Sequence, residues 1–329
     1  MGIGVPHSEQ DDDCAIKPIL LVKSGGETAL PEWRELFGTY APFLDVRSWD
    51  DISVDPEHVK YALVWQPEPG RLASYPNLRL VLSSAAGVDH ITTDPTWPKH
   101  LPLLRASTDE SAQRMGEYVC LAALALLKDL PRLVKQQTAK DWQPFETVRS
   151  APETQVGILG LGKLGLRCAS MLMALGFQVS SWSRSAKRVD GVRSYTGEEG
   201  LRTMLLSSHI VVCLLPSTPE TAGMLNRDTL ALLPEGAGLI NVARGSHVVR
   251  DDMMAALDSA RLSGAVLDVF EQEPLPPDDA LWRHPRVLVT PHIASIASRR
   301  ARVEFFCRQI AAHRENRPLE GVFDISRGY

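Results

Sequence analysis

The sequence has few cysteines and no long hydrophobic run. Its five cysteines are odd in number and widely spaced, a pattern typical of reduced thiols rather than of a disulfide framework or a zinc site. The longest unbroken apolar stretch, residues 118–127, is about half of the ~20 residues that cross a bilayer. The N-terminus lacks the basic and then apolar pattern of a secretory signal. We therefore expect a cytoplasmic protein with no membrane partner.

An excess of positive charge is also missing. The formal net charge is −5, which gives no general attraction for nucleic acid or anionic membranes. Hydrophobic residues make up 44% and charged residues 23%, an ordinary globular composition that excludes a disordered chain. Chains beyond ~250–300 residues tend to divide their core, so 329 residues predict two domains. The acidic run at residues 11–13 is interpreted as a solvated tail.

Short β-branched apolar runs alternate with helical segments along the chain. This alternation predicts parallel βα units, because a parallel crossover needs a dozen or more residues. A long helix is expected from residues 107–110 until Pro131 breaks or kinks it. A second series of six strands predicts a doubly wound sheet, and a last helix is expected near residues 298–314. The predicted strands are 18–22, 43–46, 62–65, 78–83 and 101–105, and then 154–159, 177–182, 209–215, 238–242, 265–270 and 287–290.

A glycine motif lies directly between a predicted strand and a predicted helix. Gly160, Gly162 and Gly165 have the G-x-G-x-x-G spacing of dinucleotide-binding loops. The first glycine permits the tight turn, the second lets a pyrophosphate approach the backbone, and the third lets the helix pack on the strand. The phosphates then meet the free N–H groups of the helix. The alternative is a structural glycine turn.

NAD-binding domains normally have an acidic residue about 20 positions after the glycine motif, which holds the ribose of NAD. This sequence lacks that residue. The second strand instead ends in Ser183, Arg184 and Ser185, followed by Lys187 and Arg188. A hydroxyl followed by a guanidinium suits a 2′-phosphate, so NADPH (NADP) is favoured over NADH. The alternative is a solvated basic loop.

Three ionisable residues each follow an apolar strand in the second series: Arg244, Glu273 and His292. By themselves they indicate an arginine, a carboxylate and a histidine near a dinucleotide. Taken singly, Arg244 could form a surface ion pair and Glu273 could cap a loop. His90 and His247 are rival bases, but neither lies in a motif with a comparable carboxylate, so both are interpreted as structural.

In these motifs the sequence resembles the D-isomer-specific 2-hydroxyacid dehydrogenases. The resemblance covers about residues 78–316 and includes the glycine motif, residues 214–221 (LLPSTPET), 241–245, 267–275 and 290–293. Within the family, Trp65 and residues 182–185 and 281–287 resemble the short glyoxylate/hydroxypyruvate reductase branch.

The resemblance implies a role for each residue. His292 resembles the general acid/base that protonates the substrate carbonyl, Glu273 its carboxylate partner, and Arg244 the cation that binds the substrate carboxylate. Hydride addition leaves negative charge on oxygen, so a proton donor and a fixed cation lower the barrier.

The implied cofactor-binding residues are Gly160, Gly162, Leu164, Gly165, Ser183, Arg184, Ser185, Leu215, Pro216 and Asp268, the last near the carboxamide. The implied substrate-binding residues are Trp65, Ala86, Gly87 and Arg244, with residues 84–90 forming the carboxylate-binding loop although Ala85 replaces a common glycine.

The resemblance also implies an α/β fold of two doubly wound domains. A Rossmann cofactor domain at 109–292 is inserted into a flavodoxin-like substrate domain at 1–108 and 293–329, and closure is expected about hinges near Thr108 and Ile293. The implied activity is NADPH-dependent reduction of a small 2-keto acid, glyoxylate or hydroxypyruvate, by a homodimer that contacts its partner through the cofactor domain. Two alternatives remain: an NAD-linked dehydrogenase of a larger 2-hydroxy acid, and a non-catalytic nucleotide-sensing binding protein on the same fold.

Overall fold

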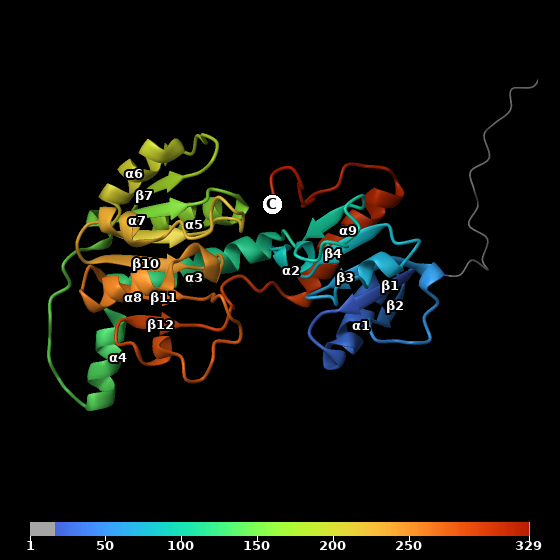
Figure 1. The fold of residues 1–329 in the computed structure, drawn as a ribbon, viewed down its shortest axis with the longest axis horizontal. Helices are drawn as coiled ribbons and strands as arrows, with labels where there is room; N and C mark the ends of the chain where they lie inside the picture. Colours follow the sequence, from blue (N-terminus) through green and yellow to red (C-terminus); the bar gives the residue numbers. More distant parts are fainter. Residues whose placement is uncertain (1–16, 329) are drawn as a thin grey trace, which may run out of the picture. The chain divides into compact units, whose positions relative to one another are not determined.

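The computed structural model describes residues 17–328 of the chain (Figure 1). These residues form two compact units: unit 1 is residues 17–106 and 299–323, and unit 2 is residues 107–298 and 324–328. Unit 2 thus includes residues 293–298 and 324–328, which the sequence-based division placed in the other domain. The acidic run at residues 11–13 and Cys14 lie outside the described residues.

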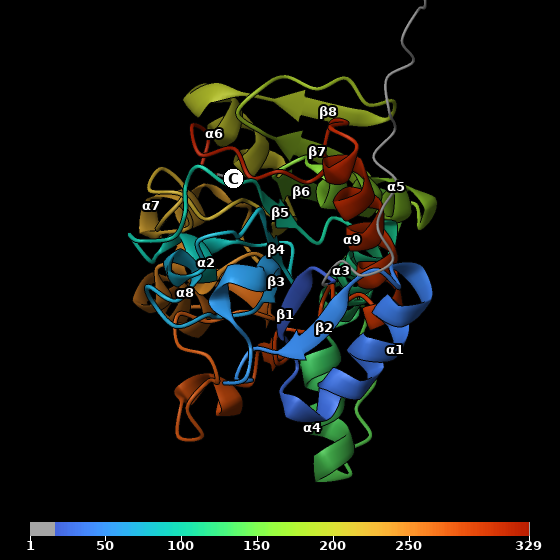
Figure 2. The same cartoon turned by 90° about the vertical axis from the view of Figure 1, so that its right-hand side faces the viewer.

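Unit 1 is built on a parallel five-stranded sheet with the strand order β2-β1-β3-β4-β5. This order is that of the flavodoxin-like doubly wound fold, so the predicted fold class is confirmed for this unit. Figure 2 shows α1 and α9 on the same face of the sheet. The strands are β1 (Ile19–Lys23), β2 (Asp45–Ser48), β3 (Val59–Val64), β4 (Leu80–Ser83) and β5 (Leu103–Arg105). The helices are α1 (Leu30–Tyr40), α2 (Asp89–Thr92) and α9 (Arg299–Arg314), with short 3-10 helices at Glu27–Ala29, Pro56–His58 and Leu72–Ser74.

Successive side chains of β1 enter two different cores, as the pleat of a strand dictates. Leu20 packs with Trp33 of α1 and Phe306 of α9 on one face of the sheet. Leu21 packs on the other face with Ile91 of α2. Both faces of the sheet are covered, which explains why its strands read as nearly continuous apolar runs in the sequence.

Unit 2 is built on a parallel seven-stranded sheet with the order β12-β11-β10-β9-β6-β7-β8. Counted from β6, this is the Rossmann order with one added strand, so the predicted fold class is confirmed here also. The strands are β6 (Gln155–Leu159), β7 (Gln178–Trp182), β8 (Val192–Tyr195), β9 (Ile210–Cys213), β10 (Ala237–Asn241), β11 (Leu262–Leu267) and β12 (Val287–Val289). The helices are α3 (Asp109–Leu127), α4 (Leu130–Ala139), α5 (Lys163–Ala174), α6 (Gly197–Ser207), α7 (Arg227–Leu232) and α8 (Arg250–Asp258), with 3-10 helices at Ala151–Glu153, Gly245–His247 and Ala280–Arg283.

The prediction of six strands in this sheet was wrong by one, because it missed the edge strand β8. This strand has only four residues, and the exposed Arg193 interrupts its apolar pattern. Edge strands are commonly short and carry charge, so they leave no continuous apolar signal.

The long helix α3 ends earlier than predicted. Its N-terminus is capped as expected, because the Thr108 hydroxyl accepts the N–H of Ser111 at 2.9 Å. The helix ends at Leu127, and Asp129 then adopts a left-handed conformation with φ 51°. Pro131 lies in the first turn of α4, where a missing N–H removes no helical hydrogen bond, so it is not the helix breaker.

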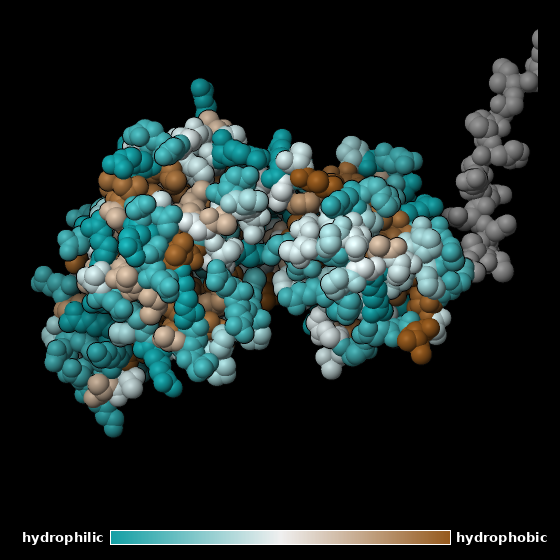
Figure 3. Space-filling model, in the orientation of Figure 1, coloured by the Kyte–Doolittle hydropathy of each residue, from teal (hydrophilic) through white to brown (hydrophobic). Residues whose placement is uncertain are grey.

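The surface is mostly polar. In the view of Figure 3, hydrophilic residues cover most of the surface and hydrophobic residues form small separate groups. The most exposed large hydrophobic side chains include Trp142 (95%) and Val148 (88%), in the connection that follows α4. Within residues 17–328, no helix combines the length and the apolar character that a membrane span requires.

The cysteines of the described residues are free thiols. Burial raises the pKa of Cys168, Cys213 and Cys307 to about 12. These three thiols are therefore protonated at neutral pH and make poor nucleophiles.

Candidate active site

The carboxyl edge of the unit 2 sheet carries most of the predicted site residues. The strand order reverses between β6 and β9, and open α/β sheets bind ligands at such a switch point. The glycine loop follows β6, and the loops with Arg244, Glu273 and His292 follow β10, β11 and β12. Because the strands are parallel, all four loops emerge at the same edge of the sheet.

The structure brings His292 and Glu273 together. Nδ1 of His292 lies 2.7 Å from Oε2 of Glu273. The other oxygen of Glu273 accepts the backbone N–H of Phe270 at 2.9 Å, which fixes the orientation of the carboxylate. The two side chains are 36% and 33% exposed, so the pair is reachable from solvent.

Glu273 is ionised in this pair. Burial is the largest influence and raises its pKa, but hydrogen bonds from His292 and from the Phe270 N–H, together with the charge of Arg244, hold the pKa below 4.5. An ionised carboxylate accepts hydrogen bonds, so Nδ1 of His292 carries a proton. Any proton exchange between His292 and a substrate would therefore involve Nε2.

Arg244 stands on the loop after β10, close to the Glu273 loop. A Cβ on the neighbouring Gly245 would collide with the backbone of Phe270, so only glycine lets these two loops pack directly. Nη1 of Arg244 donates to the carbonyl of Ala243 at 2.6 Å. Its positive charge is one of the influences that lower the pKa of Glu273.

Asp268 holds the turn on which His292 stands. His292 has a left-handed backbone with φ 54°, a conformation that is costly for a residue with a Cβ. One carboxylate oxygen of Asp268 accepts the Thr290 hydroxyl at 2.5 Å and the Ile293 N–H at 2.9 Å, and the other accepts the Ala294 N–H at 2.9 Å. Asp268 is 1% exposed, so these bonds are shielded from water. Its predicted contact with a nicotinamide carboxamide stays a prediction.

Tyr118 of α3 extends the network that begins at Asp268. The Tyr118 hydroxyl lies 2.5 Å from that of Thr290, and burial raises the pKa of Tyr118 to about 12. Because Thr290 donates its proton to Asp268, the phenol is the donor to Thr290. Farther along the same connection, Glu110 of α3 accepts the hydroxyl of Ser298 at 2.7 Å and its N–H at 3.1 Å. No role for Tyr118 or Thr290 was predicted from the sequence.

His247 is a buried bridge between two loops. Its Nδ1 accepts the Arg244 N–H at 3.1 Å, and its Nε2 lies 3.1 Å from the carbonyl oxygen of Pro216. The same carbonyl accepts the Thr221 hydroxyl at 2.7 Å, and Leu215 beside it is buried. These contacts suit a residue that fixes the loops after β9 and β10.

The glycine loop fits a dinucleotide. Gly160 has φ 101°, and Gly165 packs so closely on the Gly160 carbonyl that a Cβ would collide with it. A Cβ on Gly162 would meet nothing within 4 Å, so the backbone faces open space there. Gly162 also precedes the first turn of α5, whose N–H groups suit phosphate oxygens. Leu164, on that turn, packs partly into the core.

The loop after β7 is basic, and residues 183–189 contain no acidic side chain. Ser183 is buried and its hydroxyl donates to the carbonyl of Ser185 at 2.8 Å, which orders the loop. Arg184 is exposed. Lys187 reaches back to the glycine loop, where its Nζ donates to a backbone carbonyl at 2.5 Å. This hydrogen bond between Lys187 and the glycine loop was not predicted from the sequence.

The predicted substrate-binding residues of unit 1 lie at the carboxyl edge of its own sheet. Trp65 directly follows β3, and Ala86 and Gly87 lie in the loop after the adjacent strand β4. All three residues are half-buried. The Trp65 ring packs against that of His90, with a centroid distance of 4.3 Å.

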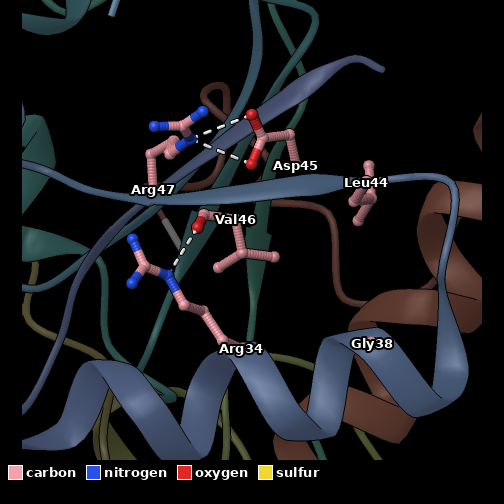
Figure 4. Close-up of a pocket in the computed structure, with 6 residues that line it drawn as sticks. All are labelled: Arg34, Gly38, Leu44, Asp45, Val46 and Arg47. Atoms are coloured by element: carbon pink, nitrogen blue, oxygen red, sulfur yellow. Dashed lines mark hydrogen bonds and ion pairs between the residues drawn. The ribbon is translucent and has the colours of Figure 1, made fainter. Parts of the chain in front are cut away.

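A shallow pocket elsewhere in unit 1 lies between α1 and β2 (Figure 4). Its guanidinium groups already have partners, since Arg34 donates to the Val46 carbonyl and Arg47 donates to both oxygens of Asp45, each at 2.9 Å. No predicted site residue lines it. The lining residues are Arg34, Gly38, Leu44, Asp45, Val46 and Arg47.

A known sequence family matches the chain. The profile described as "D-isomer specific 2-hydroxyacid dehydrogenase, NAD binding domain" matches residues 120–294, more than half of the chain.

Solved structures resemble the whole chain. One is a D-isomer specific 2-hydroxyacid dehydrogenase from Xanthobacter autotrophicus Py2 in complex with NADPH, with 39% identity, a TM-score of 0.89, and coverage of 95% of this chain and 100% of that one. An NADPH-dependent glyoxylate/hydroxypyruvate reductase from Sinorhizobium meliloti, in complex with NADP and sulfate, has 35% identity, a TM-score of 0.87 and coverage of 95% and 100%. A probable 2-hydroxyacid dehydrogenase from Rhizobium etli CFN 42, in complex with NADP and L(+)-tartaric acid, has 31% identity, a TM-score of 0.85 and coverage of 95% and 99%.

Proposed function

Because the chain belongs to the D-isomer specific 2-hydroxyacid dehydrogenase family, we propose that it reduces a small 2-keto acid, glyoxylate or hydroxypyruvate, to the 2-hydroxy acid with NADPH. The observation that carries this proposal is the 2.7 Å contact between His292 and the ionised Glu273. The NADPH-dependent glyoxylate/hydroxypyruvate reductase among the similar structures supports the choice of substrate.

In the proposed carbonyl reduction, four residues of unit 2 have separate roles. His292 gives the proton on Nε2 to the carbonyl oxygen, while Glu273 keeps Nδ1 protonated and orients the ring. Arg244 places a fixed positive charge near this pair, which suits the substrate carboxylate and the developing charge on oxygen. Asp268 keeps the His292 turn in its strained conformation.

NADPH supplies the hydride when it is bound. The Gly160–Gly162 turn and the first turn of α5 would hold its pyrophosphate, and Ser183, Arg184 and Ser185 would hold the 2′-phosphate. Lys187 adds a second cation beside this loop. Unit 2 is therefore assigned as the cofactor domain, and unit 1, with Trp65 and the 84–90 loop, as the substrate domain.

The proposed enzyme is a cytoplasmic homodimer that contacts its partner through α3 and α4. Figure 1 shows α4 and the long connection after it on the outside of unit 2. No residue of α4 is buried, and Leu133 and Val134 are 41% and 48% exposed. Leu133 and Trp142 line the same surface pocket, which a second copy would cover.

The test is a panel of 2-keto acids assayed with NADPH and with NADH, following the loss of reduced-cofactor absorbance. We expect turnover of glyoxylate or hydroxypyruvate and a higher kcat/KM with NADPH, because Arg184 and Lys187 favour the 2′-phosphate. Equal or better use of NADH with a larger acid would support an NAD-linked dehydrogenase instead. Tight NADPH binding without turnover of any acid would support a nucleotide-sensing protein.

A further inference from the structure

His90, at the start of α2 in unit 1, joins the loops that follow β3 and β4. Its Nδ1 accepts the backbone N–H of Gln66 at 3.0 Å, in the β3 loop. Its Nε2 lies 3.0 Å from Oγ of Ser83, the last residue of β4. These two bonds lie directly beside the loop at residues 84–90 that is expected to bind the substrate carboxylate.

The hydrogen bonds of Ser83 fix the tautomer of His90. The single hydroxyl proton of Ser83 is donated to the carbonyl of Gly87 at 2.8 Å. Oγ of Ser83 must then accept a proton from Nε2 of His90, while Nδ1 accepts the Gln66 N–H. His90 is therefore a neutral imidazole with its proton on Nε2, and a second proton on Nδ1 would oppose the Gln66 N–H.

These bonds help to hold two backbone segments. Gln66 has a left-handed backbone with φ 49°, a strained conformation for a residue with a Cβ. The 84–87 loop forms hydrogen bonds with the side chain of Ser83, because Oγ of Ser83 also accepts the Ala85 N–H at 3.3 Å. From α9, Arg302 donates to the Ser84 carbonyl at 3.2 Å. Together these bonds hold the loop in one shape.

His90 also supports the ring that borders this loop. Its imidazole packs against the indole of Trp65 at a centroid distance of 4.3 Å with the planes tilted by 44°. Trp65 immediately precedes Gln66, so one histidine sets both the backbone turn and the position of the aromatic side chain.

We propose that His90 is a positioning residue for substrate recognition: through Ser83, Gln66 and Trp65 it sets the shape of the 84–87 loop and determines the affinity for the 2-keto acid. It takes no part in proton transfer, because both of its ring nitrogens are engaged with the loops that it holds. This inference rests on the proposed function, since it assigns the 84–87 loop to the substrate carboxylate.

Three substitutions at His90 test the inference. His90→Phe keeps a ring against Trp65 but removes both hydrogen bonds, and we expect KM for glyoxylate or hydroxypyruvate to rise about tenfold while kcat changes by less than about threefold. His90→Asn keeps an acceptor near the Nδ1 position and His90→Gln keeps a donor near the Nε2 position, so each should recover part of the affinity and leave KM about three- to fivefold above that of wild type. The dissociation constant for NADPH should not change in any of them.

A matched control is His100→Phe, which changes an exposed histidine of the same unit and should leave KM unaltered. If His90→Phe fails to fold in thermal unfolding measurements, His90→Gln and His90→Asn decide the question, because loss of either bond should raise KM. A KM within about twofold of wild type in all folded His90 variants, or a fall in kcat as large as the rise in KM, would overturn the inference.

Binding of oxamate, an unreactive 2-keto acid analogue, separates this inference from the proposed function. Tryptophan fluorescence of the NADPH-loaded protein would report it. If wild type shows no turnover but binds oxamate, and His90→Phe binds it about tenfold more weakly, the proposed reaction fails while the role of His90 stands. If wild type neither turns over the acids nor binds oxamate, both fail.

Discussion

Two histidines, one in each unit, illustrate how neighbouring groups decide the chemistry of the same side chain. Nδ1 of His292 faces the Glu273 carboxylate at 2.7 Å, whereas Nδ1 of His90 faces the Gln66 N–H at 3.0 Å. The first nitrogen must carry a proton and the second cannot. In the proposed reaction His292 therefore gives its proton from Nε2, whereas His90 has its only proton committed to Ser83.

The two histidine loops share a second feature, which is backbone strain held by hydrogen bonds. His292 itself and Gln66, the partner of His90, both have positive φ. In unit 2 three hydrogen bonds to the buried side chain of Asp268 hold the strained turn, and in unit 1 one hydrogen bond from Gln66 to His90 does so. Because three hydrogen bonds hold a turn more firmly than one, His292 stands on the more rigid support.

The largest expected effect comes from making the same change in both loops. His292→Gln removes the proton donor, so we expect kcat to fall about 10³-fold with little change in NADPH affinity. His90→Gln should change kcat by less than about threefold. Steady-state kinetics with saturating NADPH measure both. Similar losses of kcat in the two variants would contradict the proposal that His292 donates a proton and His90 does not.

A smaller loss is expected when the partner of His292 is changed. Glu273→Gln keeps the size of the side chain but removes its charge, and its amide can present N–H to Nδ1 and favour the wrong tautomer of His292. We expect kcat to fall about 10²-fold. Glu271→Gln, which changes an exposed neighbour, is the control and should behave as wild type. Full activity of Glu273→Gln would show that the carboxylate does not select the tautomer.

The hydrogen bond from Thr290 to Asp268 supports the turn that carries His292. Thr290→Val keeps the shape of the side chain but leaves Asp268 and the buried Tyr118 hydroxyl each without one partner, so we expect a loss of about 1–3 kcal/mol in the free energy of unfolding. A fall in kcat of about tenfold should accompany it, because the His292 turn loosens. Thr290→Ser restores the hydroxyl and should recover both. Urea unfolding and kinetics provide the readouts, and an unchanged kcat in Thr290→Val would mean that the turn is held without this bond.

The smallest effect is the pH dependence of the Glu273 pair. The pKa of Glu273 is lower in the folded protein than its usual 4.5, so its pairing stabilises the fold above that pH and this stabilisation disappears as the pH falls through the folded value. Wild type should exceed Glu273→Gln in stability at pH 7 by less than about 1 kcal/mol, because the pair is a third exposed. The difference should vanish as the pH falls below the pKa of Glu273 in the folded protein. A difference that grows on acidification would have the wrong sign.

The sequence predicted most of the two sheets because their strands are buried on both faces and read as apolar runs, as in β1 and β6. It missed β8, where edge position and polar side chains remove that signal. The loops that carry Arg244, Glu273 and His292 could be placed because parallel strands all end at one edge. Whether those side chains carry the assigned roles stays a prediction that the variants above test.

Contacts between segments that are far apart along the chain could not be predicted from the sequence. Tyr118 and Thr290 are 172 positions apart, and nothing in either local pattern indicates that their hydroxyls meet. The tautomer of His90 depends on where Ser83 sends its single proton, which only the three-dimensional arrangement reveals. Pattern and spacing thus predicted which residues gather at the sheet edges but not the hydrogen bonds that orient them.

The division of unit 1 between two stretches of sequence has a consequence for biosynthesis. Its α1 face is covered by α9, which contributes Phe306 and Ile310 to the core and follows the whole of residues 107–298 along the chain. During translation Trp33 and Phe37 therefore leave the ribosome without their covering helix and wait on the order of ten seconds or more for it. The nascent chain therefore contains all of residues 107–298 before α9 is made, and the α1 face of the unit 1 sheet is covered last.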